Sequence, residues 1–325
     1  MIIDFHSHFF PENFLQALAK GETKVQFAKE ANGRMHLASP GFQTEIGVGH
    51  YDLAERIATM DAAGVDMQCL TPTIPGVHKE ETAVGIKLAR LFNEGTAAAV
   101  AQHPQRFTGL AMLPLQDPAA AVAELDYAVT QLGLKGGALF TNINGRSLDD
   151  PAYLPLFAKA VELDVPLWLH PTVPHDIGWM ADYRIVVVAG FLHETAVAVC
   201  RLIYSGVLEQ FPTLKLILSQ MGGPLPMLAE RIERAYVLYP ECQAQLSTSP
   251  TTLLKRLYLD TTPHTPEAIQ FAVQFVGVDQ VLMGSDYPQA IGDIPGAVET
   301  IKQLRLSDSD KYKIMGGNIY RLLKL

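Results

Sequence analysis

Two histidines separated by a single residue stand near the start of the chain, in the run Asp4-Phe5-His6-Ser7-His8. The residues before them are apolar, and in a β-strand the side chains of positions i and i+2 lie on the same side. Two neutral imidazoles placed side by side are suitable ligands for zinc, iron or manganese. The spacing therefore indicates half of a metal site. The alternative is a pair of strand-end histidines that pack against the loop at residues 9–11.

Short apolar runs along the chain predict the strands that would position these histidines. Eight runs are rich in Val, Ile, Leu and Phe without polar alternation, which is typical of parallel strands buried on both faces. We expect strands at residues 2–5, 65–70, 107–113, 136–140, 166–169, 214–218, 257–259 and 280–283.

Amphipathic stretches between these runs predict helices. We expect them at residues 53–63, 82–102, from 118 onward, and at 195–208, 225–236, 266–276, 293–306 and 309–323. Eightfold alternation of strand and helix predicts an α/β fold, a (β/α)8 TIM barrel, formed by residues 1–325 as one domain. A doubly wound open sheet is the alternative, but no glycine-rich phosphate loop follows the first strand. Irregular stretches at 21–50, 172–190 and 239–250 interrupt the pattern, and we expect insertions at the C-terminal mouth.

Barrel enzymes place their reacting groups at the C-terminal ends of the strands. His6 and His8 end the first predicted strand, His170 ends the fifth, and Asp286 follows the eighth. A single strand-end histidine would have an ordinary structural role. Four such residues at the same end of three strands favour a metal site.

Composition and charge exclude several other classes of protein. The net charge is −9, the pI is near 5.6, and no Lys/Arg-rich run suggests a nucleic-acid partner. Three distant cysteines without a Cys-x-x-Cys motif predict neither a disulfide framework nor a thiolate zinc site. The first residues do not resemble a signal peptide, and the apolar stretches are far shorter than the ~20 residues of a membrane-spanning helix. We therefore expect a cytoplasmic protein with no membrane partner.

Motifs at both ends of the chain resemble those of a known family. The His-x-His motif, Leu169-His170-Pro171 and Gly284-Ser285-Asp286-Tyr287-Pro288 are similar to motifs of the amidohydrolase superfamily, over nearly the whole chain. The likeness is to its aminocarboxymuconate-semialdehyde decarboxylase branch (amidohydrolase family 2). It implies a homodimer and one divalent metal ion, usually zinc and in some members manganese, bound by His6, His8, His170 and Asp286. Binuclear relatives place a lysine or an acidic bridging residue at the end of strand four, where residues 139–142 read Leu-Phe-Thr-Asn.

One position departs from the family pattern. The sixth strand of the family usually ends in His-x-Gly-Gly, whereas this chain has Gln220-Met221-Gly222-Gly223. A glutamine can orient a substrate or water but cannot exchange a proton near neutral pH. His193 is a candidate replacement base, with a surface or helix-start histidine as the alternative. By resemblance, Asp286 would also move a proton to or from the substrate.

Three further residues are candidates for substrate binding. Arg231 matches a family arginine that reaches a neighbouring subunit's pocket, and a salt bridge on the helix surface is its alternative role. His264 matches a pocket histidine of relatives, or caps a loop. Trp179 contacts an aromatic ring, or covers the barrel mouth. The other carboxylate-binding arginine of the semialdehyde decarboxylase has no counterpart in residues 45–50.

Three functions follow from these residues. The first is metal-dependent nonoxidative decarboxylation, by a carbon–carbon lyase, of a small aromatic or muconate-type carboxylic acid. The second is hydrolysis of a lactone, ester or amide, with Asp286 as the base. The third is a metal- and ligand-binding homologue whose catalysis is impaired because Gln220 replaces the usual histidine.

Overall fold

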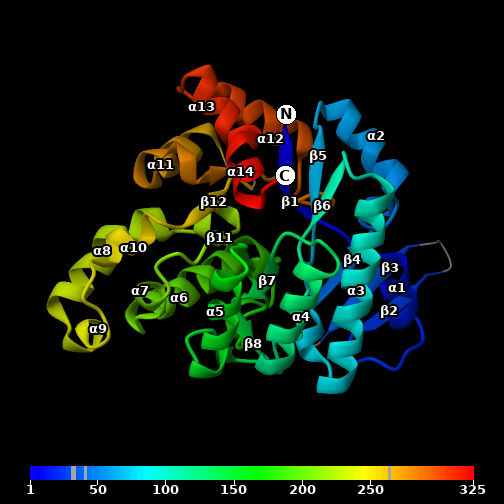
Figure 1. Cartoon of the computed structure of the whole chain (residues 1–325), viewed down its shortest axis with the longest axis horizontal. Helices are drawn as coiled ribbons and strands as arrows, with labels where there is room; N and C mark the ends of the chain where they lie inside the picture. Colours follow the sequence, from blue (N-terminus) through cyan, green and yellow to red (C-terminus); the bar gives the residue numbers. More distant parts are fainter. Residues whose placement is uncertain (31–33, 40–41, 263–264) are drawn as a thin grey trace.

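Eight parallel strands form a barrel in the structure, a computed structural model that describes residues 1–30, 34–39, 42–262 and 265–325 (Figure 1). Each strand expected from the sequence overlaps one of them. The barrel strands are β1 (Ile3–His8), β5 (Met67–Thr71), β6 (Phe107–Gly109), β7 (Gly137–Phe140), β10 (Leu167–His170), β11 (Leu216–Leu218), β12 (Tyr258–Asp260) and β13 (Val281–Leu282).

The barrel closes through two short bridges between its two sheets. One sheet has the order β1-β5-β6 and the other β13-β12-β11-β10-β7. Ala111 pairs with Gly137 across one gap, and Ser7 pairs with Tyr287 across the other, both in parallel orientation. All the C-terminal strand ends therefore lie at one mouth, and the prediction of a TIM barrel is confirmed.

Helices surround the strands, and several begin and end where the sequence predicts. Asp52 caps α2 by accepting a hydrogen bond from the Glu55 N–H, and Gly64 ends it with a φ of 70° that glycine adopts without strain. The helices are α1 (Glu12–Leu18), α2 (Leu53–Ala63), α3 (Thr82–Gln102), α4 (Pro118–Thr130), α5 (Leu154–Glu162), α6 (Phe191–Tyr204), α7 (Val207–Gln210), α8 (Leu225–Leu238), α9 (Pro240–Gln243), α10 (Pro250–Leu254), α11 (Pro266–Val276), α12 (Ile294–Gln303), α13 (Asp308–Tyr312) and α14 (Asn318–Leu323).

Two helices differ most from their predicted extents. The helix expected at 195–208 begins earlier, after a π-helical turn at Val186–Gly190, and Gly206, with a φ of 80°, separates α6 from α7. The helix expected at 309–323 is divided by a second π-helical turn at Lys313–Gly317. The continuous helix Val186–Tyr204 is long and apolar enough to span a membrane by length and composition. Half of it is buried inside the molecule, as expected of an apolar helix that packs against the barrel.

The barrel interior is apolar below the level of the histidines. Its cluster includes Phe5, Trp168 and Ile217, and Ile319 and Leu322 of α14 belong to the same cluster. The C-terminal helix α14 therefore packs against β1 and β13 (Figure 1). Because this interior is filled with side chains, polar chemistry is confined to the mouth.

The stretch at 21–50, which we expected to be irregular, contains a small antiparallel sheet. Its strands are β2 (Gln26–Lys29), β3 (Met35–Ser39) and β4 (Phe42–Ile46). Residues of this segment share an apolar cluster with α1 and α3, to which Phe14, Leu37 and Phe92 contribute. The segment ends in the 3-10 helix η1 (Val48–His50), which returns the chain to the barrel mouth.

Candidate metal centre and active site

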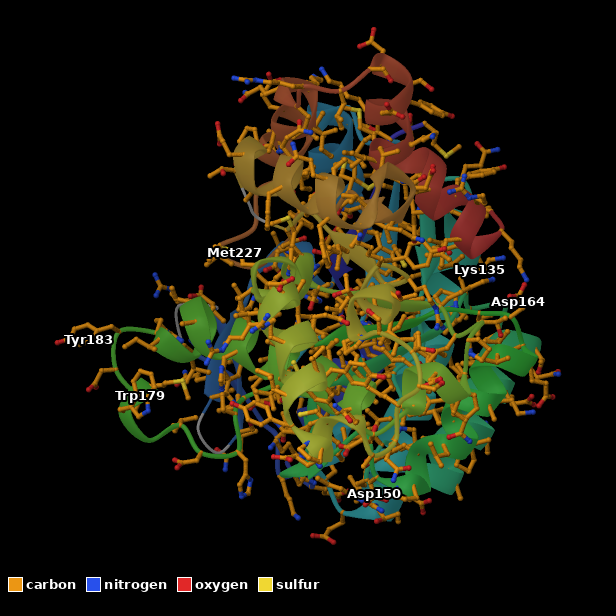
Figure 2. All side chains as sticks on the ribbon, turned by 90° about the vertical axis from the view of Figure 1, so that its left-hand side faces the viewer. Lys135, Asp150, Asp164, Trp179, Tyr183 and Met227 are labelled. Carbon is orange, nitrogen blue, oxygen red and sulfur yellow. The ribbon has the colours of Figure 1, made fainter. Side chains whose placement is uncertain are left out.

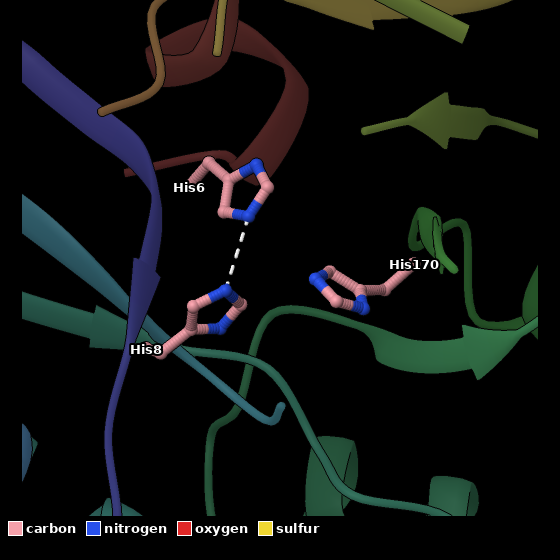
Figure 3. Close-up of side chains that lie close together, drawn as sticks. All are labelled: His6, His8 and His170. Carbon is pink, nitrogen blue, oxygen red and sulfur yellow. Dashed lines mark hydrogen bonds between the residues drawn. The ribbon is translucent and has the colours of Figure 1, made fainter. Parts of the chain in front are cut away.

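Three histidine rings from two strands are turned toward a common space at the barrel mouth (Figure 3). His6 and His8 lie on β1, and His170 is the last residue of β10. Their candidate ligand atoms all lie within 4.8 Å of one another, and the Nε2 atoms of His6 and His8 are 3.2 Å apart. All three residues are buried, with at most 3% of their surface exposed.

Hydrogen bonds on the far side of each ring establish which nitrogen is protonated. His6 Nδ1 lies 2.8 Å from Asp260 Oδ2. The Nδ1 atoms of His8 and His170 lie 3.2 and 2.7 Å from the carbonyl oxygens of Pro72 and Pro171. Because these oxygens only accept, each Nδ1 donates, and each ring in its neutral form directs an Nε2 lone pair at the common space. Three converging lone pairs fit a bound cation.

Asp286 adds a carboxylate to the histidine cluster. Its Oδ1 lies 3.0 Å from His8 Nε2 and 3.4 Å from His6 Nε2. Its backbone has a positive φ of 63°, and Asp4 holds the loop by accepting from the Ser285 N–H and hydroxyl at 3.0 and 2.7 Å. Three imidazoles and one carboxylate form a ligand set that suits zinc or manganese.

The charges of the site are strongly coupled. Burial would lower the pKa of His6, but the carboxylates of Asp260 and Asp286 raise it to about 10. Burial lowers the pKa of His170 well below its usual value, and the neighbouring His8 and His6 add to this effect. The rings cannot all be protonated together, so the cluster favours a metal cation over three protons.

Gln220 lies beside this cluster, at the end of the sixth barrel strand. Its N–H donates to Asp260 Oδ1 at 2.8 Å, the same carboxylate that accepts from His6. Gln220 and Met221 have positive φ values of 52° and 54°, a strained backbone for side chains of this size. Gln220 is 8% exposed, and its Oε1 has no hydrogen-bond partner among the described residues.

Three of the remaining predicted site residues, His193, Arg231 and Trp179, do not lie at the cluster. His193 is exposed at the start of α6, and Arg231 is exposed on α8 without an ion pair in the described part of the chain. Trp179 is 84% exposed and projects away from the molecule (Figure 2), because the insertion after β10 leads the chain outward. His264 lies outside the described residues. The roles of these four residues stay predictions.

Two residues near the centre were not predicted from the sequence. Asp260 ends β12 and is fully buried against His6, and reading the last residue of the seventh strand would have found it. His50 is buried in η1, on an insertion that no strand-end rule covers. Both come near the centre through contacts between residues far apart in the sequence, Asp260 with His6 and His50 with Phe10.

Comparisons with known proteins agree with this geometry. A family model described as amidohydrolase matches residues 3–325. The 2-amino-3-carboxymuconate-6-semialdehyde decarboxylase of Dictyostelium discoideum is 30% identical over 99% of this chain and 91% of its own.

Two solved structures are also similar. The 5-carboxyvanillate decarboxylase of Sphingomonas paucimobilis superposes with a TM-score of 0.87 at 27% identity, covering 100% of this chain and 99% of its own. The dihydroxybenzoic acid decarboxylase of a Polaromonas species, with bound manganese and the inhibitor 2-nitroresorcinol, has a TM-score of 0.80 at 27% identity, covering 100% and 97%. The chain belongs to the amidohydrolase family.

Proposed function

We propose that this protein is a metal-dependent nonoxidative decarboxylase of a small aromatic or muconate-type carboxylic acid. The observation that supports this most directly is the convergence of three Nε2 lone pairs and the Asp286 carboxylate at the barrel mouth. The relatives named above are decarboxylases of such acids. His6, His8, His170 and Asp286 would hold one divalent ion, which, when bound, stabilises negative charge that develops on the substrate.

Asp286 is the residue that we assign to proton transfer. Loss of carbon dioxide breaks the bond between the carboxylate and the adjacent carbon, leaves the electron pair on that carbon, and requires a proton there. Burial would raise the pKa of Asp286, but His6 and the hydrogen bonds with His6 and His8 hold it well below its usual range. The resting carboxylate is therefore ionised, and it donates a proton only after one has reached it.

Gln220 takes a different role in this proposal. Its buried, unpartnered Oε1 is suited to orient a substrate hydroxyl or a water molecule. Since an amide exchanges no proton near neutral pH, Gln220 does not replace the family histidine as an acid or base. His193, exposed at the start of α6, remains a proposed replacement base.

The finer properties of the protein are proposals too. We propose zinc as the resident ion, with manganese as the alternative that the Polaromonas structure supports. Several further proposals rest on the sequence alone: a homodimer, a cytoplasmic location, a single domain, and substrate contacts by Arg231, His264 and Trp179. Metal analysis tests the identity of the ion, and the mass of the assembly in solution tests the homodimer.

Release of carbon dioxide tests the function. The purified chain is loaded with zinc or manganese and incubated with hydroxybenzoates, carboxyvanillate and muconates, and carbon dioxide and the decarboxylated product are both quantified. Cleavage of lactones, esters or amides without gas would show a hydrolase. Ligand binding without turnover, with turnover gained by Gln220→His, would show an impaired homologue. His193→Ala with full turnover would remove His193 from the mechanism.

A further inference from the structure

His50 lies between the two chain segments that supply most of the metal cluster. The Phe10 N–H, two residues beyond His8, donates to the His50 carbonyl at 2.7 Å, and the two rings stack at 5.8 Å. The preceding Gly49 packs so closely on Tyr287, next to Asp286, that a Cβ at this position would overlap the tyrosine hydroxyl. The 3-10 helix η1 is therefore fitted between the end of β1 and the loop after β13.

The hydrogen bonding of the His50 ring determines its tautomer. The Gly47 N–H donates to Nδ1 at 3.1 Å, so Nδ1 presents its lone pair. In a neutral imidazole the proton is then on Nε2, which becomes a donor. That Nε2 is buried in a residue only 2% exposed and has no acceptor among the described residues. A nitrogen that bears a proton is not a metal ligand, so His50 is not a fifth ligand.

A buried donor without an acceptor is rare in native proteins, and it requires a reason. Burial lowers the pKa of His50 to about 3, and electrostatic interactions with His8 and Arg56 lower it further, while Asp286 opposes this effect. The ring is therefore neutral at neutral pH. The 3-10 helix that carries it contacts Phe10, two residues after His8, and Tyr287, the residue after Asp286.

The neighbouring cation does not offer its terminal nitrogens to a ligand. Arg56 is fully buried, and its Nη1 donates to the carbonyls of His8 and Gly49 at 2.6 and 2.8 Å. Its Nη2 donates to the Ser7 hydroxyl at 2.9 Å. Two buried donors on this side of the site have no partner among the described residues, His50 Nε2–H and Arg56 Nε–H, and only the first is on an imidazole ring.

We propose that His50 is a substrate-binding residue whose Nε2–H donates a hydrogen bond to an anionic oxygen, carboxylate or phenolate, of the bound acid. The inference rests on the proposed function for the class of ligand. A neutral donor binds the anion without holding it as strongly as an arginine does, which suits a carboxylate that must leave as carbon dioxide.

Two substitutions separate the donor from the fold. In His50→Asn the amide oxygen can replace Nδ1 as the acceptor of the Gly47 N–H, but nothing replaces Nε2. In His50→Gln the amide nitrogen can reach the position of Nε2. The full-length chain, loaded with manganese, is titrated calorimetrically with 2,6-dihydroxybenzoate and 2-nitroresorcinol, and metal content and melting temperature are measured for each variant.

His50→Asn should bind both probes about tenfold to a hundredfold more weakly, with unchanged manganese content and a melting temperature still well above the temperature of the titration. His50→Gln should recover part of the affinity. With a substrate that turns over, KM should rise more than kcat falls. Equal affinity of wild type and His50→Asn, loss of manganese in His50→Asn, or a wild type that binds neither probe would each overturn the inference. Binding that depends on His50 without carbon dioxide release would refute decarboxylation and leave the assignment of His50 intact.

Discussion

Replacing Asp260 by asparagine should weaken metal binding although Asp260 is not one of the proposed ligands. Its Oδ2 accepts from His6 Nδ1 at 2.8 Å, and its Oδ1 accepts from the N–H groups of Gln220 and Thr262 at 2.8 and 3.2 Å. The asparagine oxygen can keep the two backbone hydrogen bonds. Its NH₂ group then faces His6 Nδ1–H, so two donors oppose each other.

The conflict is relieved only if the proton of His6 moves from Nδ1 to Nε2, which removes the lone pair that the metal needs. Loss of a charge-assisted hydrogen bond costs about 1.5–3 kcal/mol, which corresponds to a factor of about 10 to 150 in affinity. Removing the partner of a metal-binding histidine typically costs about 10- to 100-fold in affinity. Both arguments predict a dissociation constant raised by one to two orders of magnitude.

The measurement is a competition between the protein and a chromophoric chelator for zinc or manganese at constant neutral pH. Asp117→Asn is the matched control, because Asp117 caps α4 through the Ala120 N–H at 3.0 Å, and asparagine caps equally well. Metal affinity should be unchanged in that variant. Wild-type affinity in the Asp260→Asn protein would refute the argument that this carboxylate holds His6 in its metal-binding tautomer.

Three other substitutions test the site and the fold. Asp286→Asn should lower kcat by about 10²- to 10⁴-fold, because an amide delivers no proton, and residual activity near wild type would refute its assignment. Burial lowers the pKa of His78 to about 3, and Lys79 adds to this effect. Between pH 6.5 and 3 the unfolded chain therefore binds a proton that the folded chain does not, so stability falls as the pH falls. In the wild type this proton uptake should lower the unfolding free energy by about 2 kcal/mol between pH 8 and pH 5. His78→Leu should not show this part of the decrease. Urea unfolding measures this, and a pH dependence like that of the wild type would contradict it, with His193→Leu at the surface as control. Asp117→Ala should lower the unfolding free energy by about 1 kcal/mol through loss of the α4 cap, without a change in metal affinity.

The order of apolar runs along the chain was enough to predict the barrel and the groups that meet at its mouth. Strands buried on both faces are continuous apolar runs, so their pattern survives without knowledge of the neighbours. Local signals such as the Asp52 cap and Gly64 also define α2. Because parallel strands in a barrel end at one mouth, the positions of His170 and Asp286 along the chain were enough to place them beside the first histidines.

Local pattern did not reveal the small sheet β2–β4 or the helices α1 and α5. The sheet lies in the stretch at 21–50, where no clear period is visible, and its strands pair with one another and pack on helices of the barrel. Pairing and packing of this kind depend on residues distant in the sequence, which a window of neighbouring residues does not contain.

The tautomers of the site histidines, and which predicted residues lie near the metal cluster, depend on contacts that form only in the folded protein. Asp260 meets His6 across 254 positions, and the Gly47 N–H leaves the proton of His50 on Nε2. The direction in which an insertion leaves the barrel determines whether Trp179 faces the site or the solvent. Residue type states which groups can bind a metal, whereas the tautomer and the exposure of each group depend on atoms that only folding brings into contact.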